Sequence, residues 1–285
     1  MFEIKVPATS ANLGIGFDCL GLAINIYNEF KFEVSDKFYY SRFKEDFCND
    51  DKLVKKPYCK VFDKAKKDII PVKISFNGDI PISRGLGSSS SLIVAGVFAA
   101  NYYLGDLFTI DELFNICANM EGHPDNVAPA IYGGFTASYL VGDEYKVVKY
   151  NVNSDLLFKV IIPSFEVKTS DARKVLPANL SYHDIVWNLS RIIHLPKALN
   201  DGNINLLKEL LDDKLHEPYR SRLIDNFDEI KLDVTKNGGC LLISGSGSTM
   251  LVISNIDFDI NTDYLTKNVS VSDGLKIYAT KNIQK

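Results

Sequence analysis

The sequence predicts an α+β fold of two domains, and three observations lead to this prediction. The chain has 285 residues, which is enough for two ordinary domains. Strand-like and helix-like hydrophobic patterns are mixed in both halves of the chain. The polar stretch Asn151–Asp155 separates the halves, so we divide the chain into domains at 1–155 and 156–285.

In the first half, alternating apolar residues predict strands, and apolar residues at helical spacing predict helices. The predicted elements are, in order, a strand at residues 4–8, a turn-rich loop at 9–16, a strand at 22–34, a helix at 54–65, a strand at 72–76, a helix from 88 to 105, a helix at 110–120 and a strand region from 133. Residues 35–52 mix charged with aromatic side chains and fit neither pattern. The first half is therefore a mixed α and β domain with one unassigned segment.

The second half shows the same mixture after the polar stretch. An apolar strand is predicted at 158–162, and a polar loop follows it. The remaining predicted elements are helices at 181–195, 203–212 and 225–236 and strands at 240–244 and 250–254. The last two strands flank Ser244–Thr249, a glycine-rich loop of the kind that joins a hairpin.

The composition excludes several classes of protein. Hydrophobic residues make up 46% and charged residues 24% of the chain, which is typical of a globular protein rather than a disordered or disulfide-rich one. The net charge of -4 and the isoelectric point of about 5.6 lead us to expect no nucleic-acid and no membrane partner. The five cysteines are scattered without a C-x-x-C pair, and the first residues do not resemble a secretory signal. We therefore expect a cytoplasmic protein with reduced thiols.

One uncharged segment, Gly85–Gly105, has the length of a membrane span. Four serines, Ser88–Ser91, occupy its first third, and polar residues lie near its end. Only residues 92–100 are continuously apolar. We therefore predict a buried helix of a globular domain.

The segment Pro81–Ser91 is the most informative loop, because it is rich in glycine and serine and leads into this predicted helix. Glycines let the backbone approach a ligand, so that N–H groups and the helix N-terminus converge on a phosphate. The lysine of a Walker A loop is absent, and the dinucleotide G-x-G-x-x-G pattern does not fit. Taken alone, the loop is also consistent with a well-capped helix.

Three loops of the chain resemble the motifs of the GHMP kinases. Pro7–Asp18 is similar to the first motif, Gly85–Ser91 to the second and Leu242–Thr249 to the third. The likeness covers nearly the whole chain. It implies a GHMP-kinase fold, with an N-terminal mixed α/β nucleotide-binding domain and a C-terminal ferredoxin-like α/β domain. It also implies ATP and Mg²⁺ as cofactors.

Three further segments resemble the homoserine kinases within that superfamily, namely Glu121–Pro129, Ser170–Pro177 and His216–Arg220. This resemblance implies ATP-dependent phosphorylation of the L-homoserine hydroxyl to O-phospho-L-homoserine, a step of threonine biosynthesis. The residues implied to bind the substrate are Asn12, Asp18, His123, Arg173 and Arg220. The two arginines would hold its carboxylate and the aspartate its ammonium group.

The resemblance also assigns residues to ATP, to the metal and to catalysis. The ATP-binding candidates are Pro81, Ile82, Ser83, Arg84, Gly85, Leu86, Gly87, Ser88, Ser89, Ser90, Ser91, Gly245 and Gly247. Asn126 and Asn12 are the candidate catalytic residues, with Asn126 at a position where mevalonate-type relatives carry a carboxylate. Ser89 and Glu121 are the candidate Mg²⁺ ligands, since Asn115 stands where some relatives place a glutamate.

Two alternatives stay open at this point. The first is another GHMP kinase that acts on a different alcohol, such as mevalonate or shikimate. The second is a non-catalytic amino-acid or nucleotide sensor on the same fold, which Asn115 and the altered third motif favour. A homodimer is an expectation from the family alone.

Overall fold

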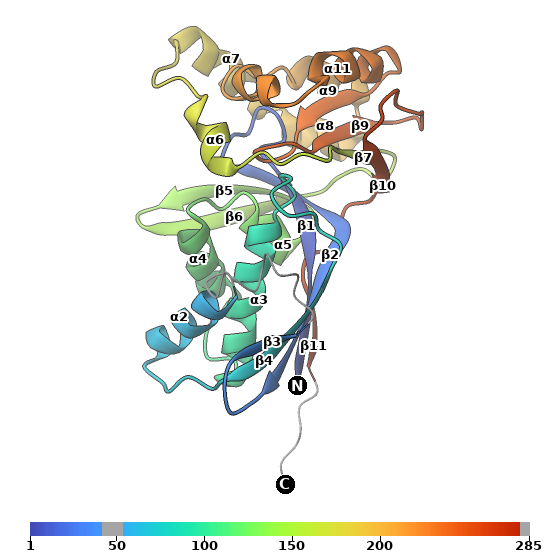
Figure 1. The fold of residues 1–285 in the computed structure, drawn as a ribbon. Helices are drawn as coiled ribbons and strands as arrows, with labels where there is room; N and C mark the ends of the chain where they lie inside the picture. Colours follow the sequence, from blue (N-terminus) through green and yellow to red (C-terminus); the bar gives the residue numbers. More distant parts are fainter. Residues whose placement is uncertain (42–53, 280–285) are drawn as a thin grey trace.

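The computed structural model describes residues 1–41 and 54–279, which form two α/β units placed one above the other (Figure 1). The unassigned segment of the sequence therefore lies partly outside the described residues. The first unit is built on a seven-stranded sheet, and the second on a four-stranded sheet. Each sheet is covered by helices, as the sequence predicts for an α+β protein.

The first sheet contains the N-terminal strands and the last strand of the described chain. Its strands are β1 (Phe2–Ala11), β2 (Leu20–Val34), β3 (Tyr39–Ser41), β4 (Val72–Gly78), β5 (Phe135–Val141), β6 (Glu144–Tyr150) and β11 (Lys276–Ala279). They run in the order β11-β1-β2-β4-β3, and β5 joins β2 to β6. The pairs are antiparallel except β3 with β4.

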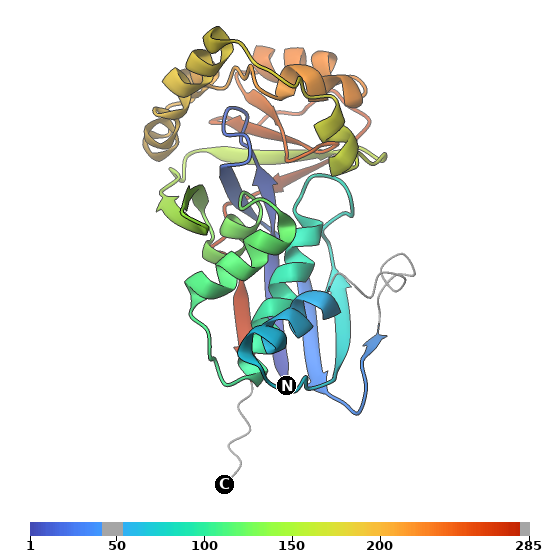
Figure 2. The ribbon, with the colours of Figure 1, turned by 90° about the vertical axis from the view of Figure 1, so that its left-hand side faces the viewer.

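Alternation along the long strands decides which face of this sheet is buried. Ile4, Phe30 and Ile74 point into the core, whereas the intervening lysines and glutamates form cross-strand ion pairs such as Lys31 with Glu3. The covering helices are α2 (Lys55–Ala65), α3 (Ser88–Tyr103), α4 (Ile110–Glu121) and α5 (Val127–Tyr132). Figure 2 shows these helices gathered on one side of the sheet.

Helix α3 is the segment that has the length of a membrane span in the sequence. It is buried from Ser90 to Asn101 between the sheet and its neighbouring helices, which explains why it is apolar on every side. Within the described residues, no helix is both long and apolar enough to cross a membrane.

The second unit packs helices on both faces of its sheet. The strands are β7 (Leu157–Ile162), β8 (Cys240–Ile243), β9 (Met250–Ser254) and β10 (Leu265–Val269), in the antiparallel order β10-β7-β9-β8. The helices are α6 (Thr169–Lys174), α7 (Tyr182–Ile192), α8 (Leu195–Asp201), α9 (Ile204–Leu210), α10 (Glu217–Arg220), the 3₁₀ turn η1 (Ser221–Leu223) and α11 (Phe227–Lys236). Helices α8 and α9 cover one face with a core that continues into β1 and β2, and α11 covers the other.

Two expectations from the sequence need correction. The polar loop predicted after β7 contains the helix α6, which the hydrophobic pattern missed because only Ala172 of its six residues is buried. The single helix predicted at 181–195 is interrupted after Ile192, and α8 begins at Leu195. Pro196 explains the break, because proline fits the first turn of a helix but not its interior.

The division at residue 155 stays a prediction. It lies between β6 and β7, where the chain leaves the first sheet for the second. The last strand, β11, nevertheless pairs with β1, with Phe2 opposite Ala279. The C-terminal strand is therefore part of the first sheet.

Candidate functional site

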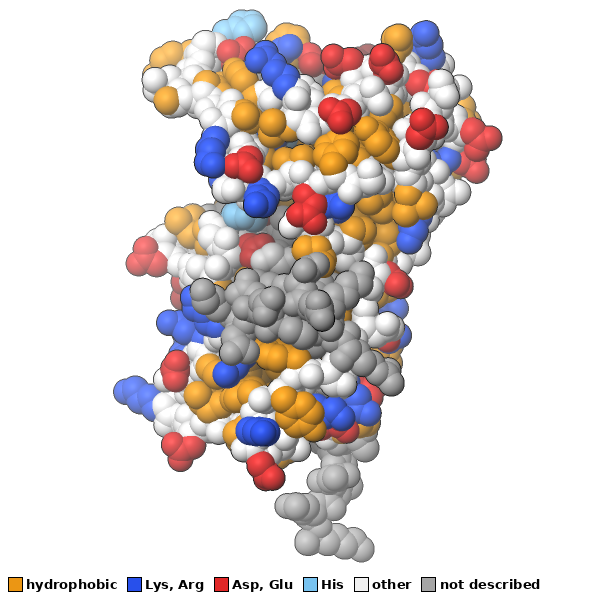
Figure 3. Space-filling model, in the orientation of Figure 1, with side chains coloured by type: hydrophobic (Ala, Val, Ile, Leu, Met, Phe, Trp, Pro, Cys, Tyr) orange, Lys and Arg blue, Asp and Glu red, His pale blue; other side chains and the backbone are white. Residues whose placement is uncertain are grey.

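A cavity of about 270 Å³ lies where the loops of the first unit face α6 and α10 of the second. Figure 3 shows the surface hollowed between the two units, where acidic, basic and histidine side chains gather. The sequence-predicted site residues that line the cavity are Asn12, Asp18, Ile82, Ser83, Arg84, Gly85, Gly87, Ser88, Ser89, Glu121, His123, Asn126, Arg173, Arg220 and Gly245. The structure thus brings together residues from six separate segments of the sequence.

Five predicted residues lie outside the lining of this cavity, namely Pro81, Leu86, Ser90, Ser91 and Gly247. The side chain of Leu86 is buried in the core. The Ser91 hydroxyl donates to the carbonyl of Ser88 at 2.7 Å and accepts from Asn28 at 2.8 Å. These two side chains therefore serve the packing of the loop rather than contact with a ligand.

The second and third glycine-rich loops are packed directly against each other. The Ser244 hydroxyl donates to the carbonyl of Gly85 at 2.7 Å, and the Thr249 N–H donates to the carbonyl of Arg84 at 3.1 Å. Gly85 has a φ of +74°, and a Cβ at this position would lie 2.1 Å from the carbonyl oxygen of Ser244. Glycine is therefore required here for both backbone conformation and space.

The N-terminus of α3 opens into the cavity. The first hydrogen bond within this helix runs from the Ser91 N–H to the Gly87 carbonyl at 3.0 Å, so the three preceding N–H groups have no partner inside the helix. The Ser88 hydroxyl is buried without a hydrogen-bond partner among the described residues. Free N–H groups at the positive end of a helix, with an unpaired hydroxyl, are suited to bind a phosphate.

Glu121, at the end of α4, reaches back to the first turn of α3. The Ser89 hydroxyl donates to one of its carboxylate oxygens at 3.1 Å, and the Ser90 hydroxyl donates to the other at 2.7 Å. A carboxylate beside hydroxyl groups is a set of hard oxygen donors, which Mg²⁺ prefers. Asn115 does not line the cavity, and its side-chain amide bonds the backbone N–H and carbonyl of Tyr145.

The loop between β1 and β2 carries Asp18 to the opposite wall of the cavity. Arg173 of α6 donates to both of its carboxylate oxygens, at 3.0 and 2.8 Å. The two residues are 155 positions apart in the sequence. This bidentate pair links the two units across the mouth of the cavity.

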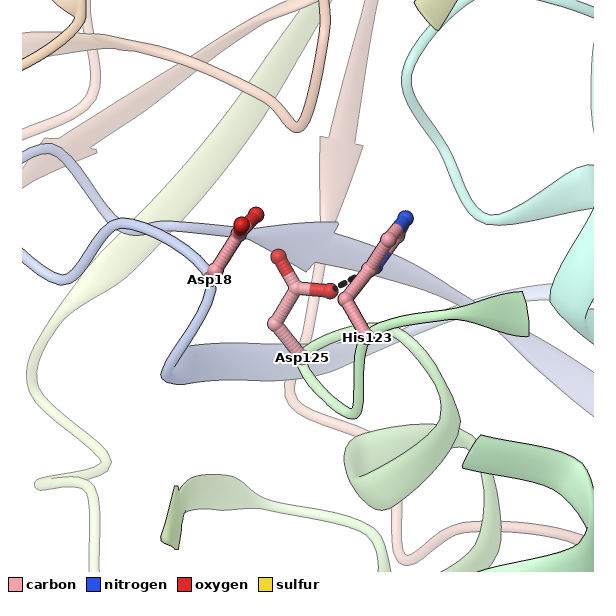
Figure 4. Close-up of side chains that lie close together, drawn as sticks. All are labelled: Asp18, His123 and Asp125. Atoms are coloured by element: carbon pink, nitrogen blue, oxygen red, sulfur yellow. Dashed lines mark hydrogen bonds and ion pairs between the residues drawn. The ribbon is translucent and has the colours of Figure 1, made fainter. Parts of the chain in front are cut away.

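A second carboxylate, that of Asp125, lies beside Asp18 and His123 (Figure 4). The Nδ1–H of His123 donates to Asp125 at 2.6 Å. Burial lowers the pKa of His123, but the hydrogen bond to Asp125 and its negative charge outweigh burial, so the pKa is raised overall. Sequence reasoning did not single out Asp125, although it lies within the segment that resembles the homoserine kinases.

Arg220 of α10 is buried at the floor of the cavity. Its Nε–H donates to the carbonyl of Ala172 at 3.1 Å, and its Nη1 donates to that of Gly245 at 3.1 Å. Burial and the charge of Arg173 lower its pKa. Among the described residues, both hydrogen-bond acceptors of this guanidinium group are carbonyls, and neither is a carboxylate. The group is therefore well placed to receive an anion.

The two predicted catalytic asparagines differ in their surroundings. Asn12 donates to the Gly245 carbonyl at 2.8 Å and accepts from the Asp18 N–H at 3.0 Å, so its amide joins the first loop to the third. Asn126 accepts a hydrogen bond from the Thr9 hydroxyl at 2.7 Å. Its amide NH₂ is thereby left to donate into the cavity.

Comparison with known proteins shows which families this chain resembles. Residues 52–134 match the family described as GHMP kinases N terminal domain. The homoserine kinase of Clostridium botulinum (strain 657 / Type Ba4) is 41% identical over 255 residues, which is 89% of this chain and 86% of that protein.

Solved structures show the same relationship. The crystal structure of homoserine kinase from Cytophaga hutchinsonii superposes with a TM-score of 0.84 at 28% identity, covering 97% of each chain. Streptococcus pneumoniae phosphomevalonate kinase, solved with phosphomevalonate and AMPPNP, shares the fold with a TM-score of 0.71 at 14% identity, over 90% of this chain and 93% of that one. From the identity and its extent, the chain belongs to the homoserine kinases of the GHMP kinase superfamily.

Proposed function

We propose that this protein transfers the γ-phosphoryl group of ATP to the side-chain hydroxyl of L-homoserine and forms O-phospho-L-homoserine for threonine biosynthesis. The observation that carries the proposal is one cavity that brings together charged residues suited to an amino acid and a helix N-terminus suited to a phosphate. Membership of the homoserine kinases supports it. The described cysteines are free thiols, which supports a cytoplasmic location. A homodimer stays a prediction.

The charged residues fit the two ends of an amino acid. Arg173 and Arg220 would hold the carboxylate of homoserine, and Asp18 would pair with its ammonium group. Asp125 lies close enough to Asp18 to contribute further negative charge. His123 and Asn12 complete the polar wall. These contacts would orient the substrate so that its hydroxyl points toward the N-terminus of α3.

The residues around α3 fit ATP and Mg²⁺. The N–H groups of Ser88, Ser89 and Ser90 would donate to phosphate oxygens, and glycines at 85 and 87 let this loop pack closely against Ser244 and Thr9. The Ser89 hydroxyl and the Glu121 carboxylate would hold the metal. When bound, Mg²⁺ neutralises negative charge on the phosphates.

Catalysis here depends on positioning rather than on a strong base. Asn126 would donate from its amide to the homoserine hydroxyl, with its own oxygen fixed by Thr9. We expect Asn126→Asp to lower kcat about 10- to 100-fold, because a carboxylate at this place loses the donor and repels the γ-phosphate. Steady-state ADP formation measures this. An unchanged kcat would leave the orienting role without support.

Glu121 provides a separate test of the metal site. Glu121→Gln keeps the size of the side chain, and its amide oxygen can still accept from one of the two serine hydroxyls, but the charge is removed. We expect the Mg²⁺ concentration for half-maximal activity to rise about tenfold, while KM for homoserine stays within about twofold. A magnesium titration at saturating substrates measures this, with the exposed Glu229→Gln as the control. An unchanged Mg²⁺ requirement would mean that another group holds the metal.

The proposed function is tested by ADP production with Mg²⁺-ATP against L-homoserine, mevalonate, shikimate and no acceptor. We expect turnover with homoserine alone. Turnover with another alcohol instead would keep the kinase fold and overturn the substrate assignment. Binding of ATP or homoserine without turnover of any acceptor would favour the sensor alternative.

A further inference from the structure

The segment that ends with Arg220 contains more buried polar chemistry than the proposed reaction uses. Asp213 and His216 are both buried, and neither lines the cavity. Asp213 bonds the start of α10, which carries Arg220, and His216 bonds the loop between β1 and β2, which carries Asp18. These contacts identify what the two residues do.

Asp213 fixes the start of α10. One of its carboxylate oxygens accepts from the N–H groups of His216 and Glu217, each at 2.7 Å. The other accepts from the side-chain amide of Asn188 at 2.6 Å. The helix that carries Arg220 is therefore tied through Asp213 to α7.

His216 reaches from the start of α10 to the loop between β1 and β2. Its Nε2–H donates to the carbonyl of Gly14 at 2.6 Å. A carbonyl only accepts, so Nε2 carries the hydrogen, and Nδ1 is buried without a hydrogen-bond partner among the described residues. Burial lowers the pKa of His216, in agreement with a neutral ring.

The same ring also packs on the loop beside the cavity. The ring of Phe17 lies 5.2 Å from that of His216, and the guanidinium group of Arg220 lies 4.9 Å from the same Phe17 ring. Phe17 immediately precedes Asp18. Through Gly14 and Phe17, His216 therefore holds the loop that presents Asp18 at a set distance from Arg220.

We propose that His216 is a positioning residue for the amino-acid end of the substrate, acting through the 14–18 loop without touching the ligand. The inference rests on the proposed function, because it concerns the two charged groups that would bind homoserine. It assigns His216 to homoserine affinity rather than to ATP binding or to the transfer step.

The experiment compares His216→Leu, which removes the donor, with His216→Gln, whose amide nitrogen can replace Nε2. We expect His216→Leu to raise KM for homoserine about tenfold, with KM for ATP and kcat within about twofold, because one buried hydrogen bond is lost. We expect His216→Gln to stay within about threefold of the parent protein. His183→Leu, at an exposed histidine of α7, is the matched control and should change neither KM.

Thermal unfolding shows whether His216→Leu folds. If it does not, a second variant tests whether His216 acts through the 14–18 loop. Phe17→Leu removes, at a partly exposed position, the ring that packs against both His216 and Arg220, and we expect a threefold or greater rise in homoserine KM alone. An unchanged homoserine KM in folded His216→Leu, or in Phe17→Leu, overturns the inference. So does an equal rise in both KM values. A parent protein without homoserine-dependent turnover overturns the proposed function as well, so the two failures are distinguishable.

Discussion

Replacing Arg220 by alanine should reduce kcat/KM for L-homoserine about 10²- to 10³-fold. Its guanidinium group is buried, and the substrate carboxylate would be its charged partner. Truncating one member of a buried charged pair costs about 3–4 kcal/mol, partly because the other charge is left unpaired. Binding of ATP should change less, since the hydrogen bonds of Arg220 run to the carbonyls of Ala172 and Gly245 and not to the N-terminus of α3.

The matched control is Arg222→Ala, two residues along the chain and exposed. We expect its kcat/KM to stay within about twofold of the parent value. Steady-state kinetics with each substrate varied in turn measures both variants. Equal losses in the two, or a loss in ATP affinity alone, would show that Arg220 does not recognise the carboxylate.

Replacing Gly85 by alanine should have the second large effect, on both stability and turnover. The added Cβ would meet the Ser244 carbonyl at 2.1 Å, and alanine would have to adopt a φ of +74°. Left-handed backbone and a clash with another backbone together cost about 3 kcal/mol. Because relief of the clash would separate the second loop from the third, we expect kinase activity to fall at least about 10²-fold.

Gly105 separates these two causes. It has a φ of +79°, but nothing lies within 4 Å of a Cβ built there. Gly105→Ala should therefore lose only about 1 kcal/mol of unfolding free energy and keep its kinase activity. Denaturant unfolding and ADP formation measure both glycine variants. Similar activities in the two would refute the idea that contact between the loops matters for the reaction.

The glycine-rich loop before α3 could be predicted from sequence because its signal is local. Glycine and serine ahead of an apolar run indicate a flexible loop and a helix start within a single short segment. The same local signal could not tell which serines face the cavity. The Ser91 hydroxyl is buried instead, where it accepts a hydrogen bond from the side-chain amide of Asn28, 63 positions away in the sequence.

The residues proposed to bind the amino acid are brought together by contacts between distant segments. Hydrophobic periodicity describes only local structure, so it could not predict these contacts. Arg173 was found through the likeness of its segment to the homoserine kinases, although the helix that carries it was missed. Its contact with Asp18 joins two units of the fold. Asp125 could not be assigned to the site from sequence, because a single aspartate after a proline is equally typical of a turn.

The pairing of Asp18 with Arg173 has a thermodynamic consequence for ligand choice. In the structure Asp18 and Arg173 neutralise each other, so homoserine would exchange one ion pair for two rather than bind to an unpaired charge. An alcohol with only an ammonium group would break the pair and leave Arg173 without a counter-charge, whereas one with only a carboxylate could bind Arg220 but would gain nothing from Asp18. We therefore expect alcohols that carry only one of the two charged groups to bind more weakly than homoserine and to act as weak competitive inhibitors.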